Sequence, residues 1–152
     1  MKGIPLISGG LACGLIIVLG EAVLNLVLLA DAWAAVFARF ALPEPSALTA
    51  GQGLLKLLLL GVFTIWLANR LRHDSGSAHR SALAAGLIVW FLVWAWVQWG
   101  MLLAGYVTVE IAALTVAWGL FELPLAALAG NRLQAHLARQ LADAPHRHPV
   151  QP

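Results

Sequence analysis

Four long apolar runs constrain the fold of this chain more than any motif does. Each holds about 20 residues or more with few charges, the length an α-helix needs to cross the hydrocarbon core of a bilayer. Only 11% of the residues are charged and 61% are hydrophobic, whereas about a quarter of a soluble domain is charged. We therefore expect an all-α fold, a bundle of four transmembrane helices in one domain over residues 1–143. The expected spans are about 5–30, 50–70, 82–104 and 107–130.

Two further helical segments are predicted outside these spans. The segment after the first span carries Trp33, Phe37 and Phe40 on one helical stripe. Aromatic side chains are enriched where a membrane meets water, so we expect a short interfacial helix there. Leucines spaced four apart after Asn131 form one apolar stripe, which predicts an amphipathic C-terminal extension. The proline-rich residues 144–152 are expected to form a disordered tail.

The basic residues are distributed unevenly along the chain. Seven of the nine Lys and Arg residues lie near the N-terminus, between the second and third spans, or after the fourth span. Cytoplasmic segments of multi-pass proteins carry the excess of Lys and Arg, so we expect both termini in the cytoplasm. The expected location is a bacterial-type cell inner membrane. Such short basic blocks favour a partner in the lipid bilayer rather than a nucleic acid, and a second copy or another membrane protein is a further expected partner.

Polar side chains inside the predicted spans are the main candidates for a functional site. A charged residue at the centre of a transmembrane helix costs about 2.5–3.5 kcal/mol on insertion scales, which makes it a functional candidate. Counting about 1.5 Å per helical residue from the predicted ends places five polar residues in the outer half of the membrane. This candidate polar cluster, drawn from all four spans, comprises Glu21, Asn25, Lys56, Gln98 and Glu110.

Lys56 is expected at the centre of this cluster, ion-paired with Glu21 and, as a second partner, with Glu110. Asn25 and Gln98 would complete the hydrogen bonds. An unpaired charge is costly in hydrocarbon, whereas a paired charge that faces the bundle interior is tolerated. Two roles remain open for the cluster. It binds a proton, an ion or a polar headgroup, or it only fastens the helices together.

Glu122 and Asp31 form a second set of candidate site residues. Glu122 lies close to Pro124, which frees a backbone carbonyl in the preceding turn. We expect this carboxyl in the inner half of the membrane, either neutral or capped by Arg70 reaching towards it. The lone Cys13 is expected to be a packing residue. No residue spacing indicates a metal site, a catalytic group or a cofactor.

Short patterns near both ends of the chain resemble those of small bacterial four-helix integral membrane proteins of unassigned function. In that group a Glu-Gly-x-Leu-Asn run ends the first helix and an Asp-x-Trp follows. Here residues 21–25 are Glu-Ala-Val-Leu-Asn, residues 31–33 are Asp-Ala-Trp, and residues 122–125 are the similar Glu-Leu-Pro-Leu. Ala22 departs from the usual glycine, and Lys56 is outside the pattern. The resemblance implies the four-helix plan and no activity, and it singles out Glu21, Asn25, Asp31 and Glu122.

The expected function is that of a structural or accessory membrane protein whose polar cluster holds the bundle or a partner. The alternative is a small transporter or channel that uses the carboxylates of Glu21 and Glu110. Small multidrug transporters also combine four helices with a carboxylate in the first, although the strong charge bias and Lys56 depart from them. An enzyme is not expected, because the sequence offers no nucleophile–base pair, metal constellation or phosphate loop.

Overall fold

The computed structural model describes residues 3–43 and 45–143, and the regular structure of this part is helical throughout. Four helical segments in it are long and apolar enough to cross a membrane, so the predicted all-α, four-helix fold is confirmed. The predicted disordered tail, residues 144–152, lies outside the described residues. The four spanning segments are Gly3–Leu28, Ala47–Arg72, Ala78–Leu103 and Val109–Asp143.

The first span ends in a turn of π-helix that the sequence does not indicate. Helix α1 (Gly3–Val23) continues directly into η1 (Leu24–Leu28). The backbone N–H of Leu29 donates to the carbonyl of Leu24 at 2.8 Å, which closes the wider π turn. The short helix α2 (Ala30–Arg39) follows at once, in the place of the predicted short helix. A π turn adds a residue to the helix and so shifts the faces on which later side chains lie.

The third span contains a second π-helical segment. It consists of α4 (Ala78–Val89), η2 (Trp90–Ala95) and α5 (Trp96–Leu103), while the second span is the single helix α3 (Ala47–Ser75). Three of the four tryptophans of this span therefore lie in or next to a widened turn.

The fourth span is one helix, α6 (Val109–Asp143), which passes through Pro124 without ending. Proline removes one backbone donor from the helix interior. The predicted amphipathic extension after Asn131 is a direct continuation of this transmembrane helix.

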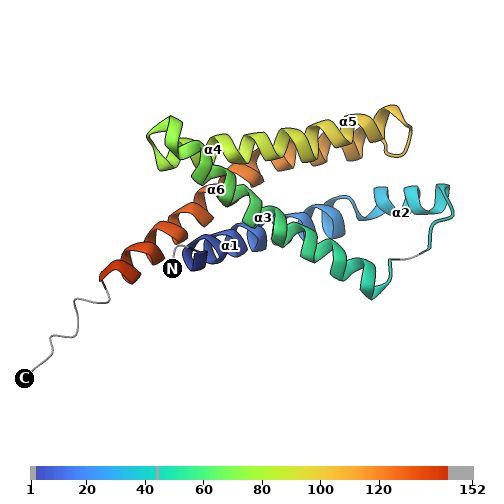
Figure 1. Ribbon diagram of the computed structural model, residues 1–152. Helices are drawn as coiled ribbons and strands as arrows, with labels where there is room; N and C mark the ends of the chain where they lie inside the picture. Colours follow the sequence, from blue (N-terminus) through green and yellow to red (C-terminus); the bar gives the residue numbers. More distant parts are fainter. Residues whose placement is uncertain (1–2, 44, 144–152) are drawn as a thin grey trace, which may run out of the picture.

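The turns between helices divide the bundle into two ends. Figure 1 shows the start of α1, the end of α6 and the α3–α4 turn on one side. Helix α2, the start of α3 and the α5–α6 turn lie on the other. We term these the termini end and the α2 end. Towards the α2 end, α3 diverges from α5 (Figure 1), and the half of α3 nearest this end is largely exposed.

Glycines bring the helices into close contact through the middle of the bundle and towards the termini end. A Cβ at Gly61 of α3 would collide with the backbone of Gly14 in α1, and a Cβ at Gly86 of α4 would lie 2.7 Å from the Cα of Pro124 in α6. Small residues at such positions allow the backbones of transmembrane helices to approach one another. These contacts fix the positions of the four spans relative to one another along the bundle axis.

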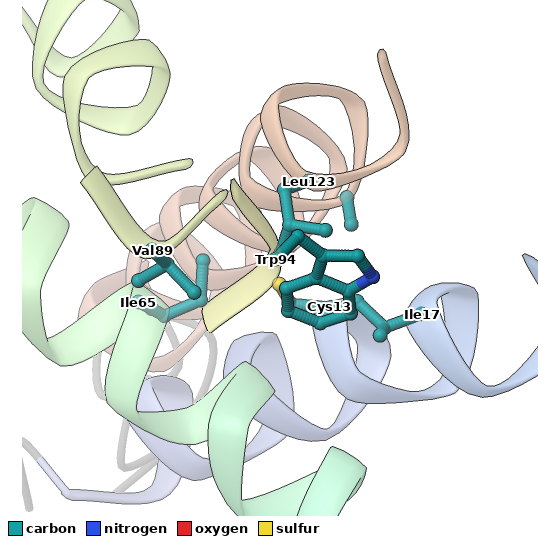
Figure 2. Close-up of a cluster of buried hydrophobic side chains, with 7 residues drawn as sticks. Cys13, Ile17, Ile65, Val89, Trp94 and Leu123 are labelled. Atoms are coloured by element: carbon teal, nitrogen blue, oxygen red, sulfur yellow. The ribbon is translucent and has the colours of Figure 1, made fainter. Parts of the chain in front are cut away.

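The main apolar core lies where the four spans meet. Figure 2 shows the indole of Trp94 close to Cys13, Ile17 and Leu123, with Val89 and Ile65 on the other side of the cluster. Cys13 is completely buried there, as expected for a packing residue. Ala126 completes this set of buried side chains.

Candidate functional site

A continuous chain of hydrogen bonds holds the carboxyl group of Glu21. Its Oε1 accepts from the indole N–H of Trp94 at 2.8 Å, and its Oε2 accepts from the amide of Asn25 at 2.9 Å. The Oδ1 of Asn25 in turn accepts from the indole N–H of Trp33 at 2.8 Å. We term these four residues the Glu21 network. It joins α1 and η1 to α2 and to η2, so it ties the first span to the third at the α2 end.

The two π-helical segments position the donors of this network. Asn25 lies in η1, and its amide also donates to the backbone carbonyl of Glu21 at 2.9 Å. Trp94 lies in η2, and its indole packs with that of Trp90 against Gly119 of α6, where a Cβ would be 3.0 Å from the Trp94 ring. The missing side chain at Gly119 therefore leaves room for both indoles.

A cavity of about 460 Å³ adjoins the Glu21 network, and we term it the Lys56 cavity. Elements of all four spans and α2 form its wall, which combines polar side chains with an apolar rim. Its polar residues outside the Glu21 network are Lys56 of α3, Gln98 of α5 and Thr115 of α6. The apolar lining residues are Leu57, Leu60, Val93, Val97 and Met101.

Three polar groups of this wall have no partner among the described residues. The Oε1 of Gln98 and the Oγ1 of Thr115 are buried without a hydrogen bond. Lys56 is exposed, and no carboxylate of the described residues lies within the 4.0 Å of a salt bridge. A buried polar atom that lacks a partner costs about 1–3 kcal/mol. The cavity thus carries hydrogen-bonding capacity that the protein itself does not use.

Four of the five residues of the predicted cluster line this one cavity, but their bonding differs from the expectation. Glu21 is bonded to Trp94 and Asn25 rather than to Lys56, and no ion pair is found within the described ranges. The indole N–H of Trp94 approaches the carboxyl from inside the bundle, whereas Lys56 lies on the exposed half of α3. Glu110 is exposed in the first turn of α6 and is not part of the cavity wall.

Glu122 lies in a different place, where α6 packs on α1. Its carboxyl occupies the space that a side chain at Gly20 would need. Glu122 is only 8% exposed, and neither of its oxygens has a hydrogen-bond partner within 3.5 Å in the described part of the chain, although the indole of Trp118, one turn earlier, is near enough to interact with the carboxyl. The expected cap by Arg70 is not formed, because the guanidinium carbon of Arg70 lies 5.4 Å from the ring centroid of Trp66 instead.

Asp31, the other residue of the second set, is exposed in the first turn of α2. A carboxylate at this position stabilises the N-terminal end of a helix through its dipole. Asp31 therefore lies apart from both the Lys56 cavity and Glu122.

Sequence reasoning did not assign a site role to three residues. Trp33 belongs to the Asp-x-Trp pattern, which could have identified it. Trp94 is one of several tryptophans in its span, and its role depends on η2. Thr115 is a small polar residue in an apolar run, and nothing in the sequence distinguishes it.

Metal binding has no support in the described ranges, where no three His, Cys, Asp or Glu side chains group together. Comparison of the chain with protein-family models, curated proteins and solved structures finds no match.

Proposed function

We propose that this chain is a small accessory protein of the membrane rather than an enzyme, and that the Lys56 cavity binds the polar part of a membrane-resident molecule. The proposal depends on one contrast between groups that line the cavity. The carboxyl of Glu21 has its donors within the protein, whereas Lys56, Gln98 and Thr115 each offer a group without a partner among the described residues. A molecule that supplies those bonds offsets the cost of burying them.

The Glu21 network supports a structural role for this carboxyl. A carrier that uses Glu21 must release it from its partners in each cycle, and here the carboxyl is fixed from two elements at once. The transporter alternative also assigns a role to Glu110, which lies outside the cavity. These observations favour a binding protein whose network keeps the cavity in shape.

The distribution of charge supports the orientation that we propose, with both termini in the cytoplasm of a bacterial-type cell and the α2 end outward. The basic residues of the described helices gather at the termini end, with Arg39 and Lys56 as exceptions. An excess of Lys and Arg is typical of the cytoplasmic side. The residues at the termini end are Arg70, Arg72, Arg80, Arg132 and Arg139.

Filling the cavity tests the proposed function. In Leu60→Trp, a large ring enters the cavity wall, while Leu59→Trp places the same ring on an exposed position of the same helix turn. After gentle extraction from the membrane, native mass spectrometry should find a bound membrane molecule on the wild type and on Leu59→Trp, but not on Leu60→Trp. Equal occupancy of all three proteins, or none on the wild type, would show that the cavity is only a packing defect.

A further inference from the structure

Lys56 provides an anion-binding group at the edge of the cavity. It lies nine residues after the start of α3 at Ala47, roughly 13 Å along the helix axis. A lysine at this depth can extend its side chain towards the headgroup level of a bilayer. It has no carboxylate partner in the described residues. An ammonium group held in this way attracts a phosphate from the lipid that surrounds α3.

Two buried oxygens of the cavity residues have no hydrogen-bond donor among the described residues. The Oε1 of Gln98 can only accept, and the Oγ1 of Thr115 can accept or donate. Both oxygens have almost no surface that a water-sized sphere can touch, so a ligand reaches them when the two side chains turn towards the cavity. The two hydroxyls of a glycerol headgroup can then donate one bond to each oxygen, whereas a choline headgroup cannot, because its quaternary nitrogen carries no hydrogen.

Glu21 fixes the orientation of a ligand in the cavity. Glu21 lines the same cavity, and like charges repel, so the phosphate is favoured at Lys56 and away from the carboxyl. The two oxygens of Glu21 each accept one bond from the protein, and a carboxylate has room for more acceptor contacts.

The size of the cavity and the surface outside it fit a headgroup with its chains in the bilayer. About 460 Å³ corresponds to roughly fifteen water molecules at about 30 Å³ each, enough for a polar group of about ten non-hydrogen atoms but not for two acyl chains. Next to the cavity, the half of α3 nearest the α2 end presents Leu54 and Leu55, each about half exposed, to the acyl region.

From these observations we infer that the Lys56 cavity binds the headgroup of an anionic phospholipid that carries hydroxyls, of the phosphatidylglycerol class. The phosphate contacts Lys56, and the glycerol hydroxyls contact Gln98 and Thr115. This inference rests on the proposed function, and it adds the chemical class of the ligand.

Lipid selection from a defined mixture tests the inference. The protein is incorporated into nanodiscs of equimolar phosphatidylglycerol and phosphatidylcholine, and the retained lipids are identified by native mass spectrometry. We expect about tenfold enrichment of phosphatidylglycerol on the wild type and less than twofold on Lys56→Gln. Lys56→Arg should retain most of the enrichment and Thr115→Val about a third of it. Arg39→Gln is the matched control, since Arg39 is exposed, lies 5.0 Å from the Phe40 ring and is not part of the cavity wall.

Several results would overturn the inference, and they differ from a failure of the proposed function. Equal retention of both lipids, still abolished by Leu60→Trp, would leave a binding cavity with a different ligand. Loss of enrichment in Arg39→Gln would indicate a general basic surface. Displacement of the lipid by water-soluble glycerophosphoglycerol at equal concentration would make the ligand a soluble phosphate. If the number of protein copies per complex changes from one to two in Lys56→Gln while the bound lipid stays the same, Lys56 would belong to an interface between copies. No lipid on the wild type would contradict both proposals.

Discussion

The two ends of the bundle satisfy their polar groups in different ways. At the termini end, the amides of Asn69 and Gln134 bond each other reciprocally at 3.2 Å, and Asn131 donates to the carbonyl of Ala78 at 3.1 Å. At the α2 end, the Glu21 network is complete, but Lys56, Gln98 and Thr115, which line the same cavity, have no partner among the described residues. The protein itself supplies the partners of Asn69, Gln134 and Asn131, whereas Glu122, packed against Gly20, has no hydrogen bond within the described residues. Where α3 diverges from α5, polar groups remain for another molecule.

Removing the close contact between α1 and α3 should have the largest effect on stability. Gly61→Ala forces a Cβ onto the backbone of Gly14, which cannot move aside as a flexible side chain can. We expect a loss of about 3 kcal/mol in the free energy of unfolding, measured by steric trapping in bicelles. Gly51→Ala is the control on the same helix, because a Cβ there meets nothing within 4 Å. An equal loss in both variants would refute the importance of this contact.

A smaller loss is expected for Gly20→Ala, because the added methyl meets the end of the Glu122 side chain rather than backbone. We expect about 2 kcal/mol, and removal of the carboxyl in Gly20→Ala/Glu122→Ala should recover more than half of it. The same unfolding assay on the two single variants and the double variant checks this. If the losses of the two single variants add up in the double variant, the added methyl at Gly20 is accommodated by residues other than Glu122.

Trp94→Phe tests the α2 end itself. It removes the indole donor to Glu21 and keeps most of the ring that packs on Ile17 and Leu123. We expect a loss of about 1–2 kcal/mol, the range for a hydrogen bond to a charged or membrane-buried group. Trp99→Phe, at a position that is 69% exposed, should change the unfolding free energy by less than about 0.5 kcal/mol. Indistinguishable values for the two variants would contradict the structural role of the network.

The smallest expected effect on stability is that of Lys56→Gln. Because Lys56 has no ion pair in the described ranges, its replacement should shift the unfolding free energy by less than about 0.5 kcal/mol in a neutral bilayer. The shift should become a destabilisation when phosphatidylglycerol is present, since a ligand that binds only the folded state stabilises it. A large loss in a neutral bilayer would assign Lys56 to the fold instead.

The sequence predicts the number of spans and the short helix after the first because apolar length and aromatic spacing are local properties. It also predicts that Glu21, Asn25, Lys56 and Gln98 lie at similar depth, since depth follows from counting residues along a helix. The choice of partner could not be predicted in this way. It depends on Trp94, which lies in the π turn η2 and so departs from the face that a regular period of 3.6 residues assigns, whereas Asn25 keeps the regular i, i+4 relation to Glu21.

The neighbours of Glu122 also could not be predicted from the sequence. Counting along its own helix places it in the inner half of the membrane, beside Arg70. Its actual neighbour is Gly20 of α1, because the vertical offset between α1 and α6 is set by glycine contacts such as that between Gly130 and Gly9. Residue counting on one helix contains no information about that offset.

Two double-mutant cycles in one lipid test whether the protein's own donors hold Glu21 while Lys56 stays free for a ligand. The cycles combine Glu21→Ala with Trp94→Phe and Glu21→Ala with Lys56→Ala, and unfolding free energies are measured in a neutral bilayer. We expect a coupling of about 1–2 kcal/mol for Glu21 with Trp94 and less than about 0.5 kcal/mol for Glu21 with Lys56. A coupling of about 2 kcal/mol between Glu21 and Lys56, with none to Trp94, would mean that Glu21 is ion-paired with Lys56 instead.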